Sequence, residues 1–280
     1  MKKIVFLFLQ LSVASLLADG VDIDIGGTAI TIPAPNGFLP VTGNMPMVNQ
    51  FLENLVAPQN IRFISFIPEQ ALSAMRRGEL PDLTHHVSVQ TAKAVVNTTV
   101  TRAGFEKFKQ LMRTQNAELV RKTEKEAPGF MDRVNQGMGS DFNVKPDFKF
   151  NGVAMLPPHD ENARWFAFSS FVNLSARTRD GTLTNFVGTV TTTCLLVKAR
   201  IFFIYVNGTG DDLHWTRQVS KDWAAAILAA NPPDAITNAK ESPPYGSLDW
   251  NRVVRIAVIG GMVGGLFGLT RFFFRRRQGN

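Results

Sequence analysis

Apolar and polar residues alternate near the start of the chain, as they do in strands with one buried face. Every second residue of 21–25 is apolar, and the Gly26-Gly27 pair that follows fits a tight turn. The alternation resumes over 29–32 and ends in a proline-rich loop. The pattern therefore predicts a β-hairpin at the start of the domain.

Four short elements are expected between this loop and residue 96. Apolar residues three and four apart predict helices, and runs of β-branched or alternating residues predict strands. In chain order the expected elements are a helix over 48–56, a strand over 61–67, a helix over 69–76 and a strand over 86–96.

Residues 101–126 carry the most regular helical pattern of the domain. Phe105 and Phe108 begin an apolar repeat close to the helical period, and charged pairs occupy the opposite face. Pro128 is expected to end this helix, because proline cannot donate the next helical hydrogen bond. Residues 130–136 are expected to add a short further turn of helix.

Four strand-like runs follow, joined by short polar turns. They cover 148–156, 165–176, 183–197 and 200–207. Because short turns join antiparallel neighbours, we expect a meander. A helix over 213–229 with an apolar face, capped by Asp211 or Asp212, closes the domain. The order predicts an α+β fold, with a twisted antiparallel sheet flanked by helices.

Three features of this layout coincide with a known group of proteins. A first strand runs into the loop IPAPNGF, from Ile32 to Phe38, a late meander follows, and a Gly-Asp-Asp turn precedes the closing helix. In these features residues 28–230 resemble the Mog1/PsbP-like group, which includes DcrB-type bacterial envelope proteins. The helical stretch 101–138 departs from that group. The resemblance implies a mostly non-catalytic domain that binds partners.

The N-terminus has the residue order of a secretory signal. Two lysines precede an apolar run over 4–11, and small residues follow. An uncleaved anchor is the less favoured alternative, because the apolar run is shorter than the ~20 residues that a membrane span needs. We therefore expect a signal peptide over 1–18, cleaved within 14–18, and an exported domain over 19–230.

A linker and a transmembrane helix are expected after the domain. Residues 231–251 contain two Pro-Pro pairs, which favour an extended and stiff linker. Residues 252–274 are apolar and glycine-rich, and they span a bilayer if the arginines near their ends reach the headgroups. The alternative, a helix buried in a core, is disfavoured because each glycine costs about 1 kcal/mol relative to alanine.

Charge orients this expected span. The positive-inside rule keeps the basic tail, 275–280, in the cytoplasm. With the signal peptide, this predicts a single-pass type I protein of a bacterial cell inner membrane, whose main domain lies in the periplasm. The residues expected at the two membrane interfaces are Trp250, Arg255, Arg271, Arg275, Arg276 and Arg277.

Glycines in the expected span predict association with another helix. Residues four apart share a helix face, and small residues let two backbones approach closely in lipid. Besides the lipid bilayer, we therefore expect a homodimer through this helix, with packing on a different membrane protein as the alternative. The glycines form two rows, Gly260, Gly264 and Gly268 beside Gly261 and Gly265.

The charge balance argues against nucleic acid as a partner. The 280 residues carry a formal net charge of +7, from 30 Lys and Arg and 23 Asp and Glu. The basic excess lies in residues 1–18 and 252–280, which contain no acidic residue. A nucleic-acid-binding domain carries its basic excess on the folded part, which here is close to neutral.

Candidate metal-binding residues are few. His159, Asp160 and Glu161 lie in one expected hairpin loop and are ligand types that metals accept, so a periplasmic hydrolase or metal-dependent enzyme using this loop is the alternative function. A solvated turn is the plainer interpretation. His85 and His86 are adjacent at the start of a strand, where neighbouring side chains point to opposite faces and do not share a metal.

The single cysteine, Cys194, lies among apolar residues of an expected strand, where a thiol behaves as a small hydrophobe. One cysteine excludes an intramolecular disulfide and cysteine-based zinc or iron–sulfur sites. No nucleophile elbow or phosphate loop is present. We therefore expect no catalytic residue, metal or cofactor, but a membrane-anchored extracytoplasmic module that binds or assembles an unknown envelope protein.

Overall fold

In a computed structural model of the chain, the described residues are 20–77, 79–114, 116–177 and 181–232, with Trp250, Arg252, Val253, Ala257 and Gly260. The expected signal peptide and basic tail, and most of the expected linker and membrane span, lie outside these residues. Within them, no helix combines the length and the apolar character needed to cross a membrane.

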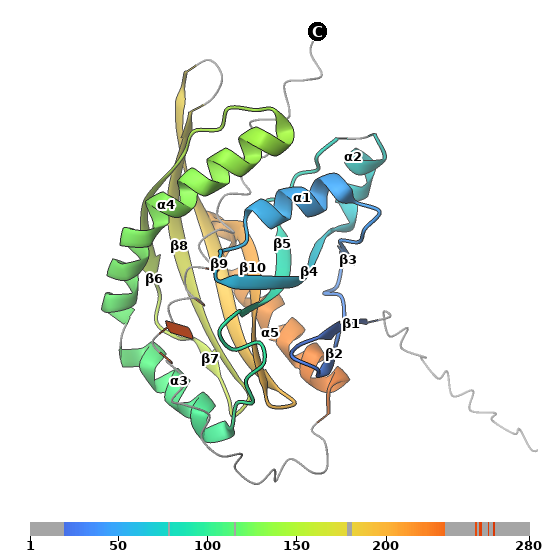
Figure 1. The fold of residues 1–280 in the computed structure, drawn as a ribbon, viewed down its shortest axis with the longest axis vertical. Helices are drawn as coiled ribbons and strands as arrows, with labels where there is room; N and C mark the ends of the chain where they lie inside the picture. The colour runs from blue at the N-terminus through green and yellow to red at the C-terminus, as the bar shows by residue number, and fades with distance from the viewer. Residues whose placement is uncertain are drawn as a thin grey trace, which may run out of the picture.

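An eight-stranded antiparallel sheet forms the centre of the described part of the chain (Figure 1). Seven strands follow one another across it in the order β3 (Phe38–Pro40), β4 (Asn60–Pro68), β5 (His86–Ala92), β10 (Arg200–Thr209), β9 (Leu183–Val197), β8 (Trp165–Arg177) and β6 (Phe148–Met155). The eighth, β7 (Asp160–Glu161), pairs with β8. The expected meander is therefore confirmed, and β3 to β5 extend it on one side.

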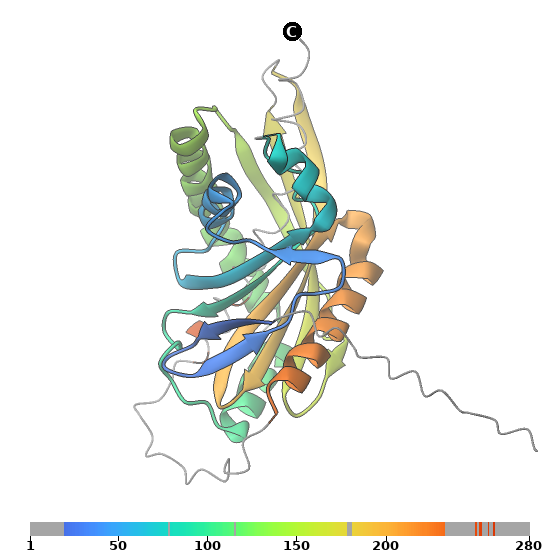
Figure 2. The same cartoon turned by 90° about the vertical axis from the view of Figure 1, so that its right-hand side faces the viewer.

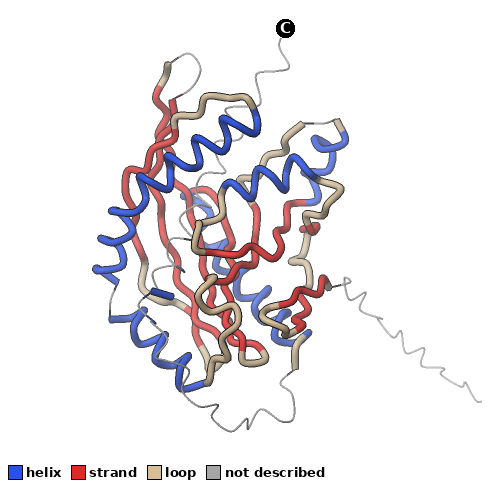
Figure 3. Tube along the Cα trace, in the orientation of Figure 1, coloured by secondary structure: helices blue, strands red, loops and turns tan. Residues whose placement is uncertain are grey.

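Helices cover both faces of this sheet (Figures 2 and 3). One face, here called the outer face, is covered by α5 (Leu213–Ala230) and by the hairpin of β1 (Val21–Asp24) and β2 (Ala29–Ile32). The inner face is covered by α1 (Pro46–Asn54), α3 (Arg102–Thr114) and α4 (Asn116–Phe142). Short helical turns complete the fold, namely η1 (Glu69–Ala71), α2 (Leu72–Arg76) and η2 (Gly210–Asp212).

Alternation along the central strands sorts side chains between the two faces. On β10, Ile204 and Val206 lie in the apolar cluster under α5, whereas Phe203 and Tyr205 lie in the cluster under α3. Successive side chains of a strand point to opposite faces, so one apolar strand supplies two cores. The α+β fold with a sheet between two helical layers follows from this two-sided burial.

Trp223 fixes α5 to the outer face. Its side chain is buried and packs edge-on against Phe66, with the ring centroids 5.6 Å apart. Its indole N–H donates a hydrogen bond to the carbonyl oxygen of Pro33 at 2.8 Å. A buried tryptophan is most favourable when its N–H finds such a partner. One side chain thus joins the helix, the sheet and the segment after the first hairpin.

The helix α4 continues through Pro128, so the expectation that this proline ends the helix is wrong. Beyond the proline, Phe130, Val134 and Met138 are buried in the cluster beneath α1 and α4. A proline inside a helix costs about 3 kcal/mol. Burying each large apolar side chain gains roughly 1.5–3 kcal/mol. The buried stripe therefore outweighs the proline.

Gly26, in the turn between β1 and β2, has little room for a side chain. Its φ is +58°, and a Cβ there would lie 2.2 Å from the carbonyl oxygen of Val96. The neighbouring Gly27 also has a positive φ, +80°, but a Cβ there would meet nothing within 4 Å. An alanine at either position would therefore have backbone strain, but only an alanine at Gly26 would also collide with a neighbour.

We predict that Gly26→Ala destabilises the domain more than Gly27→Ala. A left-handed conformation costs an alanine about 1–2 kcal/mol, which both variants share. Gly26→Ala adds the collision with the backbone at Val96, so its loss in the free energy of unfolding should be larger by at least ~1 kcal/mol, within the cost of overpacking. Urea unfolding of both variants tests this, and equal losses would contradict it.

Candidate functional site

A row of buried polar side chains crosses the inner face of the sheet between two apolar clusters. Strand pairing places Ser88 between Ser65 and Tyr205. It also places His86 directly opposite Asn207. The buried polar residues of this row are Ser65, His86, Ser88, Gln90, Tyr205 and Asn207. Three strands, β4, β5 and β10, therefore bring hydrogen-bonding groups to one place.

These side chains line a small pocket, here called the inner pocket. Its cavity volume is about 20 Å³, which is room for about one water molecule or the end of one small polar group. Leu52 and Leu55 line it from α1 and from the residue after that helix, while Arg62 and Gly260 complete its wall. The inner pocket thus has a polar floor and a partly apolar wall, as small-molecule sites generally do.

Arg62 brings a positive charge to the wall of the inner pocket, where Glu53 neutralises it. Its Nε and Nη2 donate to Oε2 of Glu53 at 3.0 and 2.9 Å, and Nη2 also donates to Oδ1 of Asn49 at 2.5 Å. A third donor, Nη1, reaches Oγ of Ser65 at 3.3 Å. The guanidinium group is therefore held by α1, and the inner pocket carries little net charge.

Burial keeps His86 neutral in this setting. Burial is the largest cause that lowers the pKa of His86 to about 3; the nearby charges of His85 and Arg62 act in the same direction, against a backbone hydrogen bond at Leu83 that raises it. The Nδ1 atom of His86 lies 3.1 Å from the carbonyl oxygen of Leu83, and Nε2 lies 2.9 Å from Nδ2 of Asn207. The neutral ring therefore donates from Nδ1 and accepts at Nε2.

Tyr205 and Cys194 also stay protonated on the inner face. Burial raises the pKa of the Tyr205 hydroxyl and that of the Cys194 thiol well above their usual ranges. The Tyr205 hydroxyl donates a hydrogen bond to the carbonyl oxygen of Ala257 at 3.1 Å. Efficient proton transfer needs a group whose pKa is near the working pH. These residues are therefore suited to hydrogen bonding rather than to acid–base catalysis.

Two buried amide oxygens at the inner pocket have no hydrogen-bond partner within the described residues, Oδ1 of Asn60 and Oδ1 of Asn207. The two side chains are only 3% and 2% exposed. Their Nδ2 groups both donate hydrogen bonds. That of Asn60 donates to Oε1 of Gln90 at 2.9 Å, and that of Asn207 donates to the carbonyl oxygen of His86 at 3.2 Å. An unpaired buried acceptor costs about 1–3 kcal/mol, so a hydrogen-bond donor is favoured here.

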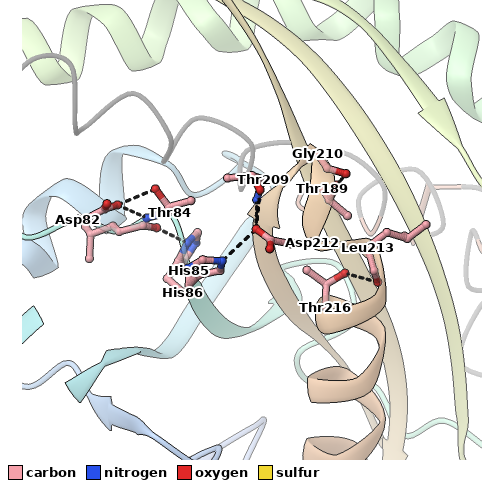
Figure 4. A network of polar contacts seen from close by, with 11 residues as sticks. Asp82, Thr84, His85, His86, Thr189, Thr209, Gly210, Asp212, Leu213 and Thr216 are labelled. Carbon is pink, nitrogen blue, oxygen red and sulfur yellow. Dashed lines mark hydrogen bonds and ion pairs between the residues drawn. The ribbon is translucent and has the colours of Figure 1, made fainter. Parts of the chain in front are cut away.

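A second polar cluster lies where the central strands β5 and β10 end, around Asp212 (Figure 4). Its Oδ2 accepts hydrogen bonds from the backbone N–H and the hydroxyl of Thr209, at 2.7 and 2.6 Å, and lies 2.9 Å from Nε2 of His85. Burial raises the pKa of Asp212, but these bonds outweigh it and hold the pKa below its usual range. Asp212 thus closes the capping box of η2 with Thr209, and it occupies the N-cap position of α5 without a side-chain cap bond to that helix.

His85 belongs to this second polar cluster, whereas His86 faces Asn207 in the inner pocket. The ring of His85 also packs edge-on against Trp215, with the ring centroids 4.6 Å apart. The two adjacent histidines therefore have different partners, as the sequence predicted. Both partners of His85 hold the loop before α5 in place, which is a structural role.

The expected metal loop does not bring its three residues to one point. Asp160 and Glu161 form β7, where adjacent side chains point to opposite sides. Glu161 forms an ion pair with Arg113. Burial and, to a smaller extent, the charge of Arg217 lower the pKa of His159 to about 4, against the charge of Asp160, which raises it. Throughout the described part of the chain, no group of three or more His, Cys, Asp or Glu could hold a metal ion.

Two of the residues expected at a membrane lie on the inner face of the sheet. The Trp250 ring packs against Phe108 with the ring centroids 5.9 Å apart, and Gly260 lines the inner pocket. The other residues of the two expected sets lie outside the described residues, namely Gly261, Gly264, Gly265, Gly268, Arg255, Arg271, Arg275, Arg276 and Arg277. For these, membrane association stays a prediction.

Sequence reasoning did not identify the inner pocket. The alternation of His86, Ser88 and Gln90 with valines is also the pattern of a strand with one solvated face. The sequence signal that could have revealed the pocket is the pair Tyr205 and Asn207, two polar residues in an otherwise apolar strand. Their significance depends on β5 being their neighbour, which the sequence does not state.

Known proteins add little to this site. No family model matches the chain, and no curated protein matches it. Among solved structures, it is similar to the solution structure of cyanobacterial PsbP (CyanoP) from Synechocystis sp. PCC 6803, with a TM-score of 0.30 and 9% identity over 76% of this chain and 94% of that chain. It is also similar to the Saccharomyces cerevisiae Ran-binding protein Mog1p, with a TM-score of 0.26 and 8% identity over 76% and 90%.

These two proteins belong to the group that the layout of residues 28–230 resembles. Their identities of 9% and 8% and TM-scores of 0.30 and 0.26 are too low for either to inform what this chain binds. The inner pocket must therefore be interpreted from its own residues.

We predict that His86→Gln weakens the dependence of folding stability on pH. Burial lowers the pKa of His86 from 6.5 to about 3, so the unfolded chain binds more protons between these two values. Wild-type stability is therefore fully present above 6.5 and falls as the pH drops towards 3. The free energy of unfolding of the wild type, minus that of His86→Gln, should increase from roughly pH 4 to pH 7.

Urea unfolding at several pH values measures this difference. Ser88→Ala is the matched control, because it changes a buried neighbour in the inner pocket that does not titrate. Its difference from the wild type should stay constant with pH. A constant difference for His86→Gln as well would contradict the prediction.

Proposed function

We propose that the chain is a membrane-anchored, extracytoplasmic module that binds or assembles a partner without catalysis, held in a bacterial inner membrane with its domain in the periplasm. The observation that supports binding is the inner pocket, where the Asn207 amide oxygen is buried and lacks a donor among the described residues. Its setting favours hydrogen bonding over proton transfer, because His86 stays neutral and Tyr205 stays protonated.

The chemistry of the inner pocket favours an uncharged polar ligand. Glu53 already neutralises Arg62, so an added charge would have no counterion at the pocket wall. Burying an unpaired charge is far more costly than burying a hydrogen-bonded neutral group. The free acceptor on Asn207 calls for a donor, such as the N–H of an amide or the hydroxyl of a sugar. The ligand is therefore a small neutral molecule or a neutral polar group of a partner.

The membrane part of the proposal rests on the sequence. A signal-like segment over 1–18 and an apolar segment over 252–274 with a basic tail are the features of a type I membrane protein. A domain on a proline-rich linker is suited to reaching partners near the bilayer, because extended linkers add ~3.1 Å per residue.

We predict that small uncharged amides raise the thermal stability of the full chain in detergent through the inner pocket. A ligand present at about 100 times its Kd stabilises the folded state by about 2.7 kcal/mol. Asn207→Leu removes the free acceptor and should abolish the increase in Tm. Thermal unfolding against formamide, acetamide and N-methylacetamide measures the effect.

Thr191→Val is the control for this experiment. Thr191 is buried and its hydroxyl is bonded to that of Thr216 at 2.9 Å, but it lies on the outer face under α5. This variant should lose stability yet keep the ligand-induced increase. The same increase in Asn207→Leu as in wild type would contradict binding in the inner pocket. Stoichiometric zinc or manganese in the purified chain would favour the metal-dependent enzyme instead.

We predict that an alkaline phosphatase fused after residue 240 is active in bacteria and that one fused after Gln278 is inactive. This enzyme needs disulfides, which form in the periplasm and not in the cytoplasm. The two fusion points lie on either side of the expected span, so a type I topology separates them. Activity at both points would show that the segment does not cross the membrane, and the anchor would have to be abandoned.

A further inference from the structure

The described residues of the C-terminal segment place one helix face on the inner face of the sheet. Trp250, Val253, Ala257 and Gly260 are helical and are separated by three, four and three positions, which puts them on one side of a helix. Val253 and Ala257 are buried at 1% and 0% exposure, and both belong to the apolar cluster under α3. Arg252, which is off this stripe, is exposed.

Trp250 anchors one end of this stripe on α3. Its ring lies beside Phe108, and its Cζ2 atom lies 3.2 Å from the point where a Cβ of Gly104 would be. A side chain at Gly104 would therefore press against the indole. The first turn of α3 leaves room for a large aromatic ring at this point.

Gly260 marks the other end, at the inner pocket. A Cβ on Gly260 would lie 2.4 Å from both the Tyr205 hydroxyl and Nδ2 of Asn60. Three residues earlier, the carbonyl oxygen of Ala257 accepts the hydrogen bond of the Tyr205 hydroxyl. The helix backbone thus touches the polar floor of the sheet directly, which only a residue without a side chain permits.

We propose that the inner face of the sheet is a docking groove for a helix with a small-residue face, and that its occupant is the chain's own segment from Trp250 to Gly260. The groove recognises an aromatic ring at one end and a glycine at the other, ten residues apart. Between them it accepts small or β-branched side chains and donates one hydrogen bond, from Tyr205, to the helix backbone.

Docking has a consequence that rests on the proposed function. Val253, Ala257 and Gly260 fall within the expected span 252–274, and they cannot lie against Tyr205 and inside a bilayer at the same time. Docking and membrane insertion therefore exclude each other. The docked helix places Gly260 at the wall of the inner pocket, and insertion removes that wall.

The glycine row predicted to contact another helix in lipid thus has a second use. Gly260 begins the row that continues, four residues apart, at Gly264 and Gly268. In lipid and on the sheet the same property matters, because a missing side chain lets the helix backbone approach its neighbour. The docked contact leaves Oδ1 of the adjoining Asn60 without a partner among the described residues, which favours reversible docking.

Disulfide trapping in the full chain tests this docking. Cys194, the single natural cysteine, is first replaced by serine so that two introduced thiols are the only ones present. The pair Asn60→Cys and Gly260→Cys is then oxidised in mild detergent. Because a Cβ at 260 would lie 2.4 Å from the Asn60 amide nitrogen, these thiols are within reach of each other. Mass spectrometry of the digested chain identifies the linked peptides.

The matched control pairs Asn60→Cys with Gly261→Cys, one residue further along the chain, since successive residues of an α-helix point about 100° apart. We expect at least about tenfold more link within one chain for the first pair than for the control, since a disulfide requires close Cβ atoms. A second measurement keeps Trp250, Asn60 and Gly260 native: Val253→Cys, on the buried side of the segment, should react with a maleimide at least about tenfold more slowly than Arg252→Cys, on its exposed side.

Two results would overturn the proposal. One is that Val253→Cys and Arg252→Cys react with a maleimide at equal rates and that Asn60→Cys with Gly260→Cys forms no link within one chain. The other is that the links join two chains, which would make a second copy the occupant. Neither result would affect the phosphatase fusions or the ligand-induced increase in Tm, so docking and the proposed function fail separately.

Discussion

Burial of the central strands on both faces is the constraint on which the rest of the structure depends. β5 and β10 lie between α5 on the outer face and α3 and the C-terminal helix on the inner face. A strand in that position has no solvated side, so each polar side chain on it needs a partner inside the protein. On the outer face hydroxyls pair with one another, as Thr193 does with Ser220 at 2.6 Å. On the inner face the pairing is incomplete among the described residues, and the inner pocket contains an unpaired acceptor, Oδ1 of Asn207.

The same constraint decides what kind of chemistry this face can perform. Burial disfavours charge, so His86 stays neutral and Tyr205 and Cys194 stay protonated at physiological pH. The ion pairs that border the sheet, such as Arg62 with Glu53, fix loops and helices in place. A face of neutral donors and acceptors recognises shape and hydrogen-bond pattern. That property is the physical basis for proposing a binding module, and it explains why the backbone of a helix, with a free carbonyl and a missing side chain, suits the same surface.

Most of the order of strands and helices was determined by the sequence, because periodicity is a local property. The short strands β3 and β7, and the division of residues 101–126 between α3 and α4, were not. The alternation around Gly26-Gly27 and the short turns of the meander needed no information from distant residues, and the structure confirms both. The passage of α4 through Pro128 was decided by tertiary packing, since the buried stripe after the proline gains its energy from β6 and α1. The inner pocket was decided in the same way. Asn60 and His86 come from the consecutive strands β4 and β5, whereas Asn207 lies far along the chain on β10, and only the pairing of β10 with β5 brings it beside them.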